Sequence, residues 1–346
     1  MEDGPMQDVQ SARSAAPRRT GVLLVNTGSP AAPTPEAVRA YLEVFLMDDR
    51  IRPLPAPVWR AILDHIILPR RCPASAAKYS AIWTDAGSPL IVGCEALAGR
   101  VADVLADDGS LDGVEVRAAM IYGEPSIASM LAGLRDEGCG RLVVLPLYPQ
   151  SAYSTTAAAL DAVDRALARM GWDPLRVAIE SYGDDEAYLD AIADSVDAAG
   201  YRPDEDYLLF SFHAVPLPDV DGGDTYPDQV RRSARAVVKR LGAADGTWSL
   251  SYQSPFEDGR RWTGPNTMRE VRELARSERR RLVVACPGFA VDCLETLHDI
   301  ERVAREEYRA VRAGGDDADL LYVPCLNDSH AHAAVLAGCL RRVLGA

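Results

Sequence analysis

Short runs of leucine and β-branched residues alternate along the chain with longer segments in which apolar residues recur every three or four positions. Runs of the first kind predict buried strands, and segments of the second kind predict amphipathic helices. The predicted strands are 21–26, 114–121, 141–147, 175–180, 207–212, 247–252, 281–286 and 319–324. The predicted helices are 93–107, 126–137, 157–170, 185–199, 227–241, 266–277, 293–312 and 329–343. This alternation is typical of an α/β protein whose parallel sheets are covered by helices on both faces.

The second half of the chain repeats the strand ends of the first half. Three matched pairs occur in the same order: GVLLVNTGSP at 21–30 with YLLFSFHAVP at 207–216, IYGEPS at 121–126 with SYQSPF at 251–256, and RLVVLPLYPQ at 141–150 with RLVVACPGFA at 281–290. We interpret the repeat as a duplication that makes two similar lobes with a cleft between them. The carboxyl ends of parallel strands open into such clefts. Only the later copies place a histidine, His213, and an acid, Glu295, there, so we expect asymmetric chemistry.

These patterns divide the chain into segments. We predict a disordered N-terminal tail over 1–19, an N-terminal lobe over 20–180, a C-terminal catalytic lobe over 181–320, and a last strand with a C-terminal helix over 321–346. The stretch 41–92 has no counterpart in the second half and includes two arginines, Arg70 and Arg71. It is apolar, so we interpret it as a lip beside the cleft for a large ligand that is apolar in its middle and acidic at its edge. A helical hairpin packed on the core is the alternative.

Charge and composition narrow the class of protein. The chain has 37 Lys and Arg against 51 Asp and Glu, a net charge of −14, which disfavours nucleic acid or an anionic membrane as the main partner. A cationic ligand such as a metal ion fits better. The sequence shows neither an apolar run of about 18 residues nor a basic segment leading into an apolar one, so we predict a cytoplasmic protein. The seven cysteines form no C-x-x-C pair, and we expect neither disulfides nor a zinc knuckle.

Candidate chemistry gathers at two strand ends. His213 closes a strand just before a turn, where its imidazole is expected to leave the sheet and can accept a proton or bind a metal. Glu295 and Asp299 lie four residues apart on a predicted helix, a spacing that puts both carboxylates on one face. Such a pair can form a hard oxygen site for a cation, and a solvated acidic face is the alternative. His298 is expected to point in another direction.

Polar and aromatic side chains also cluster at turns. Tyr122, Tyr148 and Tyr153 would suit a flat aromatic ligand, and ordinary loop packing explains them equally well. The Ser-Thr-Thr sequence at 154–156 precedes a predicted helix and is interpreted as its cap. Neither G-x-S-x-G nor G-x-G-x-x-G follows an early strand, which disfavours an α/β hydrolase or a dehydrogenase.

Taken together, ten short motifs resemble those of ferrochelatase. They are LVNTGSP at 24–30, YSAIW at 79–83, GSPL at 87–90, YGEPS at 122–126, PLYPQ at 146–150, STT at 154–156, SFHAVP at 211–216, DTYPDQ at 224–229, YQSPF at 252–256 and PGFAVDCLETL at 287–297. The resemblance implies two Rossmann-like lobes, each with a parallel four-stranded sheet flanked by helices, in a pseudo-duplicated chelatase fold. It also implies a lyase of haem biosynthesis that inserts Fe²⁺ into protoporphyrin IX, forms protohaem and releases two protons.

The same resemblance assigns roles to individual residues. His213 and Glu295 match the catalytic pair, and together with Asp299 they match the metal-handling groups. The residues that match porphyrin-binding positions are Thr27, Arg70, Arg71, Tyr79, Ser88, Tyr122 and Tyr148. Three departures, Ala214, Thr225 and Pro255, remove no reacting group.

Cofactor and partner expectations follow from the resemblance as well. Iron is expected as a substrate, and no tightly bound cofactor is expected. Some relatives bind a 2Fe-2S cluster through C-terminal cysteines, but here only Cys339 follows Cys325, and Tyr153 stands near another cysteine position, so we predict no cluster. The expected partners are a porphyrin and ferrous iron, without nucleic acid, with peripheral membrane contact and as a monomer. Alternatives are a coproporphyrin III ferrochelatase, a cobalt or nickel chelatase for another tetrapyrrole, and a haem or porphyrin carrier without turnover.

Overall fold

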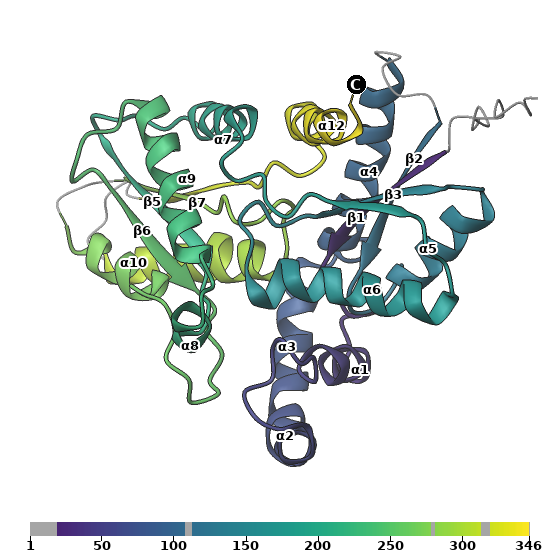
Figure 1. The fold of residues 1–346 in the computed structure, drawn as a ribbon. Coiled ribbons are helices and arrows are strands. Elements are labelled where there is room, and N and C mark those ends of the chain that lie inside the picture. Colours follow the sequence, from purple (N-terminus) through teal and green to yellow (C-terminus); the bar gives the residue numbers. More distant parts are fainter. Residues whose placement is uncertain (1–18, 108–112, 278–280, 313–318, 346) are drawn as a thin grey trace, which may run out of the picture.

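The computed structural model describes residues 19–107, 113–277, 281–312 and 319–345. The predicted N-terminal tail therefore lies outside the described residues, apart from Arg19. Figure 1 shows two lobes side by side, with a group of helices projecting below the junction between them.

Each lobe contains a parallel four-stranded sheet, as predicted. The first sheet has the order β2-β1-β3-β4, with β1 (Thr20–Asn26), β2 (Val114–Met120), β3 (Arg141–Pro146) and β4 (Leu175–Ala178). The second has the order β6-β5-β7-β8, with β5 (Asp206–His213), β6 (Trp248–Gln253), β7 (Arg281–Ala285) and β8 (Leu320–Val323). The two orders correspond strand for strand, which confirms the pseudo-duplicated α/β architecture.

Helices cover both faces of each sheet. In the first lobe they are α4 (Pro89–Asp107), α5 (Ile127–Asp136) and α6 (Ala158–Met170). In the second they are α7 (Glu186–Ala198), α8 (Leu217–Asp221), α9 (Tyr226–Leu241), α10 (Thr267–Ala275) and α11 (Arg305–Val311), followed by α12 (His330–Leu344). Three π-helical segments also occur: η1 (Leu63–Ile67), η2 (Tyr153–Ala157) and η3 (Leu294–Ala304).

Strand β1 shows why helices cover both faces of the first sheet. Its side chains alternate between two apolar clusters: Val22 and Leu24 belong to the cluster that contains α4, and Leu23 and Val25 to the cluster that contains α5 and α6. All four are fully buried, and burying such a side chain stabilises the fold by about 1.5–3 kcal/mol. A strand covered on both faces reads as a continuous apolar run, which is the pattern in the sequence.

The two lobes share packing contacts and a common apolar core. Helix α12 follows β8 in sequence, but it packs against α4 of the first lobe as well as against α7 (Figure 1). One apolar cluster therefore runs from β1 to Phe210 and Phe212 of β5. Within the described part of the chain, none of the helices has the length and apolarity that a membrane span requires.

The insertion forms the projecting helices, α1 (Pro35–Phe45), α2 (Ala56–Ile62) and α3 (Leu68–Ile82), with η1 between the last two. Helix α1 begins where Thr34 accepts a hydrogen bond from the backbone of Ala37 and Pro35 takes the first helical position. Helices α1 and α3 pack on each other around Trp59 and Leu63, so the insertion has a small core of its own. We call residues 35–82 the lip. The helical unit begins before the predicted stretch 41–92 and ends before its last residue, packs as the alternative expected, and also lines the pocket described next, whereas its ligand stays a prediction.

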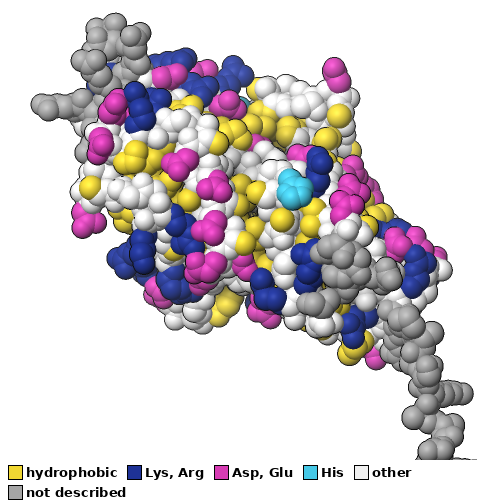
Figure 2. Space-filling model, turned by 90° about the horizontal axis from the view of Figure 1, so that it is seen from above, with side chains coloured by type: hydrophobic (Ala, Val, Ile, Leu, Met, Phe, Trp, Pro, Cys, Tyr) yellow, Lys and Arg dark blue, Asp and Glu magenta, His cyan; other side chains and the backbone are white. Residues whose placement is uncertain are grey.

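The surface carries mixed charge on the face that includes α7 and α12. Figure 2 shows acidic and basic side chains interspersed over the described part of this face. Ion pairs between α9 and the region of α7 include Arg240 with Asp190 and Arg232 with Asp184.

Candidate active site

A pocket lies between the two lobes and the lip. Its walls come from the carboxyl ends of β1, β3 and β5, from α1 and α3, and from the start of η3. The empty space between these walls, including the open mouth, is about 1440 Å³. This is the position that the duplicated strand ends predict for a ligand cleft.

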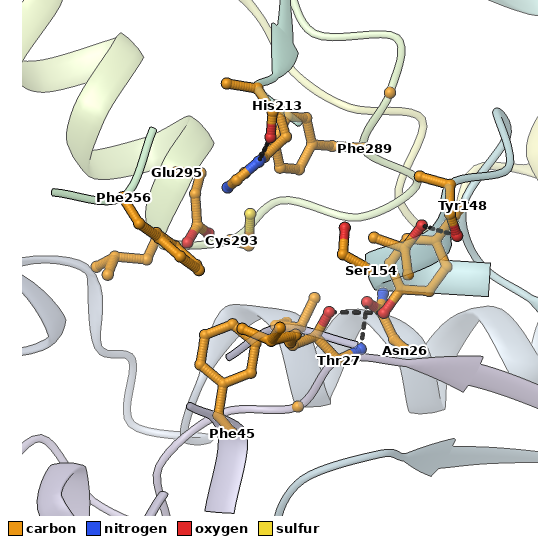
Figure 3. A pocket seen from close by; sticks show the side chains of 18 of the residues that line it. Asn26, Thr27, Phe45, Tyr148, Ser154, His213, Phe256, Phe289, Cys293 and Glu295 are labelled. Carbon is orange, nitrogen blue, oxygen red and sulfur yellow. Dashed lines mark hydrogen bonds between the residues drawn. The ribbon is translucent and has the colours of Figure 1, made fainter. Parts of the chain in front are cut away.

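His213 is the last residue of β5, and its ring points into the pocket (Figure 3). Its Nδ1 lies 2.7 Å from the carbonyl oxygen of Ala214. A carbonyl oxygen can only accept, so Nδ1 carries the hydrogen and the neutral ring keeps its lone pair on Nε2. The contact thus fixes the tautomer and leaves Nε2 able to accept a proton or bind a metal ion.

Glu295 is the second residue of η3 and lies half-buried in the pocket wall. Its backbone oxygen accepts a hydrogen bond of 2.9 Å from Nε2 of Gln253, a buried residue at the end of β6. Figure 3 shows the Glu295 carboxylate and the His213 ring facing the same part of the pocket. The structure therefore brings together His213, which lies in one later repeat, and Glu295, which follows another.

A buried carboxylate fixes the start of η3. Asp292 accepts hydrogen bonds from Thr296 Oγ1 at 2.9 Å, from Asn327 Nδ2 at 2.7 Å and from the hydroxyl of Tyr322. Thr296 Oγ1 in turn accepts from the backbone N–H of Cys293 at 2.9 Å. These contacts tie the first turn of η3 to the end of β8. The wider i→i+5 turn of a π-helix is frequent at functional sites.

Cys293 also lines the pocket, and Figure 3 places its sulfur close to the space between His213 and Glu295. Burial, followed by the neighbouring Glu295 carboxylate, raises the pKa of this thiol well above its usual value. The thiol is therefore protonated at neutral pH. All seven cysteines of the chain are buried free thiols.

The opposite wall comes from the first lobe. Thr27 Oγ1 and the hydroxyl of Tyr148 lie 2.6 Å apart, and burial raises the pKa of Tyr148, which stays a neutral phenol. Thr27 follows the end of β1, and Gly28 has a φ of +107°, a conformation that favours glycine. A Cβ there would lie 1.9 Å from the carbonyl oxygen of Tyr122, so only glycine allows this close turn.

Phe256 joins the lip to the second lobe. Its ring centroid lies 6.1 Å from that of Phe45 on α1, 6.2 Å from that of His213 and 5.3 Å from that of Trp262. The guanidinium of Arg71 on α3 lies 5.4 Å above the same ring. The pocket thus has an aromatic wall beside the histidine, which suits a flat apolar ligand.

Most of the predicted site residues line this pocket. They are Thr27, Arg71, Tyr79, Ser88, Tyr148, His213 and Glu295. Arg70 is exposed on α3, and Tyr122 packs in the lip core with its ring centroid 5.1 Å from that of Phe45. Neither is among the pocket-lining residues.

Asp299 does not line the pocket either, because its carboxylate is engaged elsewhere. Its Oδ1 lies 3.2 Å from Lys78 Nζ and 2.8 Å from His298 Nδ1. The expectation that His298 points in another direction was wrong, since the two adjacent side chains fold toward each other on the π-helix. The expected cap at 154–156 also differs: η2 begins at Tyr153 without a side-chain cap, and Ser154 and Thr155 line the pocket instead.

Sequence reasoning assigned no role to Gln253, Phe256, Trp262 or Cys293. A signal for the first two was available, because the second repeat pair places Tyr-Gln-Ser-Pro-Phe at the end of β6, beside the end of β5. The π-helical turn that brings Cys293 to the pocket has no comparable signature in the sequence.

Comparison with known proteins identifies the family. The family model named Ferrochelatase matches residues 19–344. The ferrochelatase of Aromatoleum aromaticum is 42% identical over 330 residues, which cover 95% of this chain and 89% of the relative. That of an Azoarcus species is 43% identical over 318 residues, which cover 91% and 85%. The chain belongs to the ferrochelatase family.

Membership in the ferrochelatase family gives the chain its activity, the insertion of a metal ion into a porphyrin. Solved structures agree on the fold. SirB from Bacillus subtilis with Fe³⁺ matches with a TM-score of 0.55 at 10% identity, covering 94% of this chain and 95% of SirB. The sirohydrochlorin chelatase SirB from Bacillus subtilis subspecies spizizenii in complex with cobalt matches with a TM-score of 0.51 at 13% identity, covering 93% and 94%. At these identities the likeness establishes the chelatase fold alone.

Proposed function

We propose that this ferrochelatase inserts Fe²⁺ into protoporphyrin IX, forming protohaem in haem biosynthesis, a lyase reaction that releases two protons. The observation that carries the proposal is that His213 presents Nε2 to the same part of the pocket as the Glu295 carboxylate, beside an aromatic wall. Iron insertion requires a proton acceptor, an anionic group for the cation and a surface for a flat macrocycle.

In this proposal His213 accepts protons and Glu295 binds the metal ion. Nε2 of His213 accepts a proton from a pyrrole N–H, because Nδ1 is held by the Ala214 carbonyl. The Glu295 carboxylate binds Fe²⁺ and balances its charge as the ion loses water. The two pyrrole N–H bonds break as iron binds the four ring nitrogens, so the ring becomes a dianion that neutralises Fe²⁺. The two protons pass in turn through Nε2 of His213 to water, which conserves the total charge. Walls from both lobes and the lip hold the macrocycle bent, which stabilises the transition state more than the flat substrate.

The porphyrin carboxylates are assigned to the polar part of the pocket, where Arg71, Tyr79 and Ser88 lie. Burial raises the pKa of Tyr79 well above its ordinary value, so its hydroxyl stays a neutral hydrogen-bond donor. Arg71 contributes a permanent positive charge.

Coproporphyrin III is the second candidate, because Arg50 and Arg260 also line the pocket and this porphyrin has four carboxylates where protoporphyrin IX has two. Those two arginines already bind carboxylates of the protein, Asp161 and Asp258. Their engagement favours the porphyrin with fewer carboxylates.

The deciding experiment supplies each porphyrin with Fe²⁺ under anaerobic conditions and follows metal insertion by absorbance. We expect a higher kcat/KM for protoporphyrin IX. A higher value for coproporphyrin III would reverse the substrate assignment, and porphyrin binding without insertion would identify a carrier.

Two substitutions test the catalytic pair. We expect His213→Ala and Glu295→Gln each to lower kcat at least about a hundredfold while porphyrin binding persists, because a general base contributes roughly 10²- to 10⁴-fold. His330→Ala and Glu306→Gln are matched controls, since both side chains are exposed and distant from the pocket lining. Near-normal turnover in either pocket variant would reject the assignment.

The lip is the part of the chain that we assign to peripheral membrane contact. Its exposed apolar side chains are Val44, Leu54, Val58 and Ile66, with exposed fractions between 41% and 59%. A lipid surface is the fitting occupant because an apolar porphyrin dissolves in lipid and the lip borders the pocket. We expect a Val58→Asp, Ile66→Asp variant to lose cosedimentation with neutral phosphatidylcholine vesicles. Unchanged cosedimentation, or none for the unaltered protein, would refute the assignment.

We also place the protein in the cytoplasm as a monomer without a tightly bound cofactor or 2Fe-2S cluster. Cell fractionation, light scattering, and iron and sulfide analysis of the purified protein test these three proposals separately.

A further inference from the structure

Asp299 lies at the meeting point of three hydrogen-bond donors. Its Oδ1 accepts from Lys78 Nζ at 3.2 Å and from His298 Nδ1 at 2.8 Å, and its Oδ2 accepts from Ser254 Oγ at 3.4 Å. Ser254 has a φ of +55°, a strained conformation for a residue with a Cβ. Both carboxylate oxygens are therefore engaged by the protein itself.

The contact with Lys78 connects two parts of the pocket wall. Lys78 lies on α3, next to the pocket residue Tyr79, and Asp299 follows the pocket residue Glu295 by four residues on η3. Helices α3 and η3 pack against each other, although 221 residues separate Lys78 from Asp299. The ion pair thus links the lip directly to the helix that carries Glu295.

Other contacts also join the lip to the second lobe. Arg260 Nη2 donates to the backbone oxygen of Ile51 at 2.9 Å, Arg71 lies over the ring of Phe256, and the ring of Phe45 contacts that of Phe256. These three contacts involve pocket-lining residues, whereas neither Lys78 nor Asp299 lines the pocket. A change in the Lys78–Asp299 pair can therefore act on the lip without removing a group that touches the substrate.

We propose that Lys78 is a positioning residue whose ion pair with Asp299 holds α3 against η3, so that Asp299 anchors the lip and is not a metal ligand. A cation approaching Asp299 would have to displace an ammonium group already in place. The proposal rests on the proposed function, because its kinetic effects are read in porphyrin metallation.

The solvent exposure of the two side chains sets how strongly the Lys78–Asp299 ion pair can act. The side chains of Lys78 and Asp299 are 44% and 29% exposed, so water screens their attraction. Exposed ion pairs of this kind change an equilibrium by about 1.5- to 5-fold. A contact of this strength contributes to the position of the lip without locking it in place.

Four variants test the proposal: Lys78→Met, Asp299→Asn, both together, and the charge reversal Lys78→Asp with Asp299→Lys. The sequence has one other lysine, Lys239, exposed on α9, so Lys239→Met is the matched control. The measurements are kcat, the KM for porphyrin, the KM for Fe²⁺, and porphyrin dissociation followed by fluorescence. Hydrogen exchange over residues 68–82 reports the lip without any substrate.

If the pair positions the lip, Lys78→Met and Asp299→Asn each raise the porphyrin KM and speed porphyrin dissociation about 1.5- to 5-fold. The KM for Fe²⁺ and kcat stay unchanged, the double variant resembles the singles, and the charge reversal restores part of the loss. Exchange over 68–82 rises in both single variants and not in Lys239→Met.

A different result overturns the proposal. If Asp299 passes iron to the site, Asp299→Asn raises the KM for Fe²⁺ or lowers kcat, and Lys78→Met does neither. Unchanged exchange over 68–82 in Lys78→Met also refutes the positioning role, even if Asp299→Asn does not fold. If the unaltered protein binds porphyrin but inserts no iron, the proposed function fails, and the dissociation and exchange measurements still decide the role of Lys78.

Discussion

Gln253 lies between the two groups that we propose as catalytic, His213 and Glu295, and replacing it by leucine should reduce both stability and turnover. Its backbone oxygen accepts from the N–H of Ala214 at 2.9 Å, and its Nε2 donates to the backbone oxygen of Glu295 at 2.9 Å. Its Oε1 also accepts from the hydroxyl of Ser211. Leucine has a similar volume and keeps the backbone contact, but it loses these two side-chain contacts and the weaker contact from Cys286 Sγ, which lies 3.8 Å from Oε1.

The expected losses of stability and of kcat follow from the Gln253 contacts with Ser211 and Glu295. Each hydrogen bond contributes about 0.5–1.5 kcal/mol, so Gln253→Leu should lower the free energy of unfolding by about 1–3 kcal/mol. If the bond to Glu295 holds that residue in its reactive position, its loss lowers kcat by roughly 2- to 13-fold, since about 1.4 kcal/mol corresponds to a factor of ten. The KM for porphyrin should change little, because Gln253 is not among the pocket-lining residues.

Urea unfolding and anaerobic iron insertion measure the two effects. Ser211→Ala is the matched control, because it removes the Ser211 bond to Gln253 Oε1 and leaves the Gln253 bond to Glu295 intact. We expect this control to lose stability and keep its kcat. The reasoning fails if Gln253→Leu retains the kcat of the unaltered protein, or if Ser211→Ala lowers kcat equally.

Two further predictions concern buried groups at the lobe junction. Burial lowers the pKa of His332 to about 4 from its ordinary 6.5, so the unfolded chain binds more protons between these values. The neutral His332 therefore stabilises the fold fully above pH 6.5, and this stabilisation is lost as the pH falls toward 4. Across this range, urea unfolding should show that the free energy of unfolding of the unaltered protein falls by up to about 3 kcal/mol more than that of His332→Gln. A Cβ on Gly93 would lie 2.4 Å from Cγ1 of Val291, across the lobe junction, so Gly93→Ala should cost about 1–3 kcal/mol by overpacking. Adding Val291→Ala should restore part of that loss in thermal unfolding, and a Gly93→Ala protein as stable as the unaltered one would contradict the packing argument.

The sequence was sufficient to predict the sheets because their central strands are buried on both faces. A continuous apolar run such as 22–25 or 282–285 has few alternatives once helical segments flank it. The repeat then located the cleft and the pair His213 and Glu295. These predictions depend on local composition and on the rule that parallel strands end at one edge.

Other parts of the site depend on contacts that no local pattern contains. The π-helical geometry of η3 is set by Asp292 together with Tyr322 and Asn327, which come from a distant part of the chain. The Lys78 contact with Asp299 likewise requires the lip to fold back across the cleft. The four-residue spacing of Glu295 and Asp299 therefore predicted that both carboxylates lie on one helix face, but it did not predict that Asp299 binds the ammonium group of Lys78.

The position of α12 imposes an order on biosynthesis. The face of α4 that α12 covers belongs to the first lobe, yet α12 follows the whole second sheet in the chain. From the end of α4 at residue 107 to the end of α12 at residue 344, a ribosome adding about 5–20 residues per second needs roughly 10–50 s. Throughout that interval the nascent first lobe exposes apolar surface, which makes it a target for chaperones that bind unfinished chains. The N-terminal half completes its own folding only after the C-terminal half has been translated.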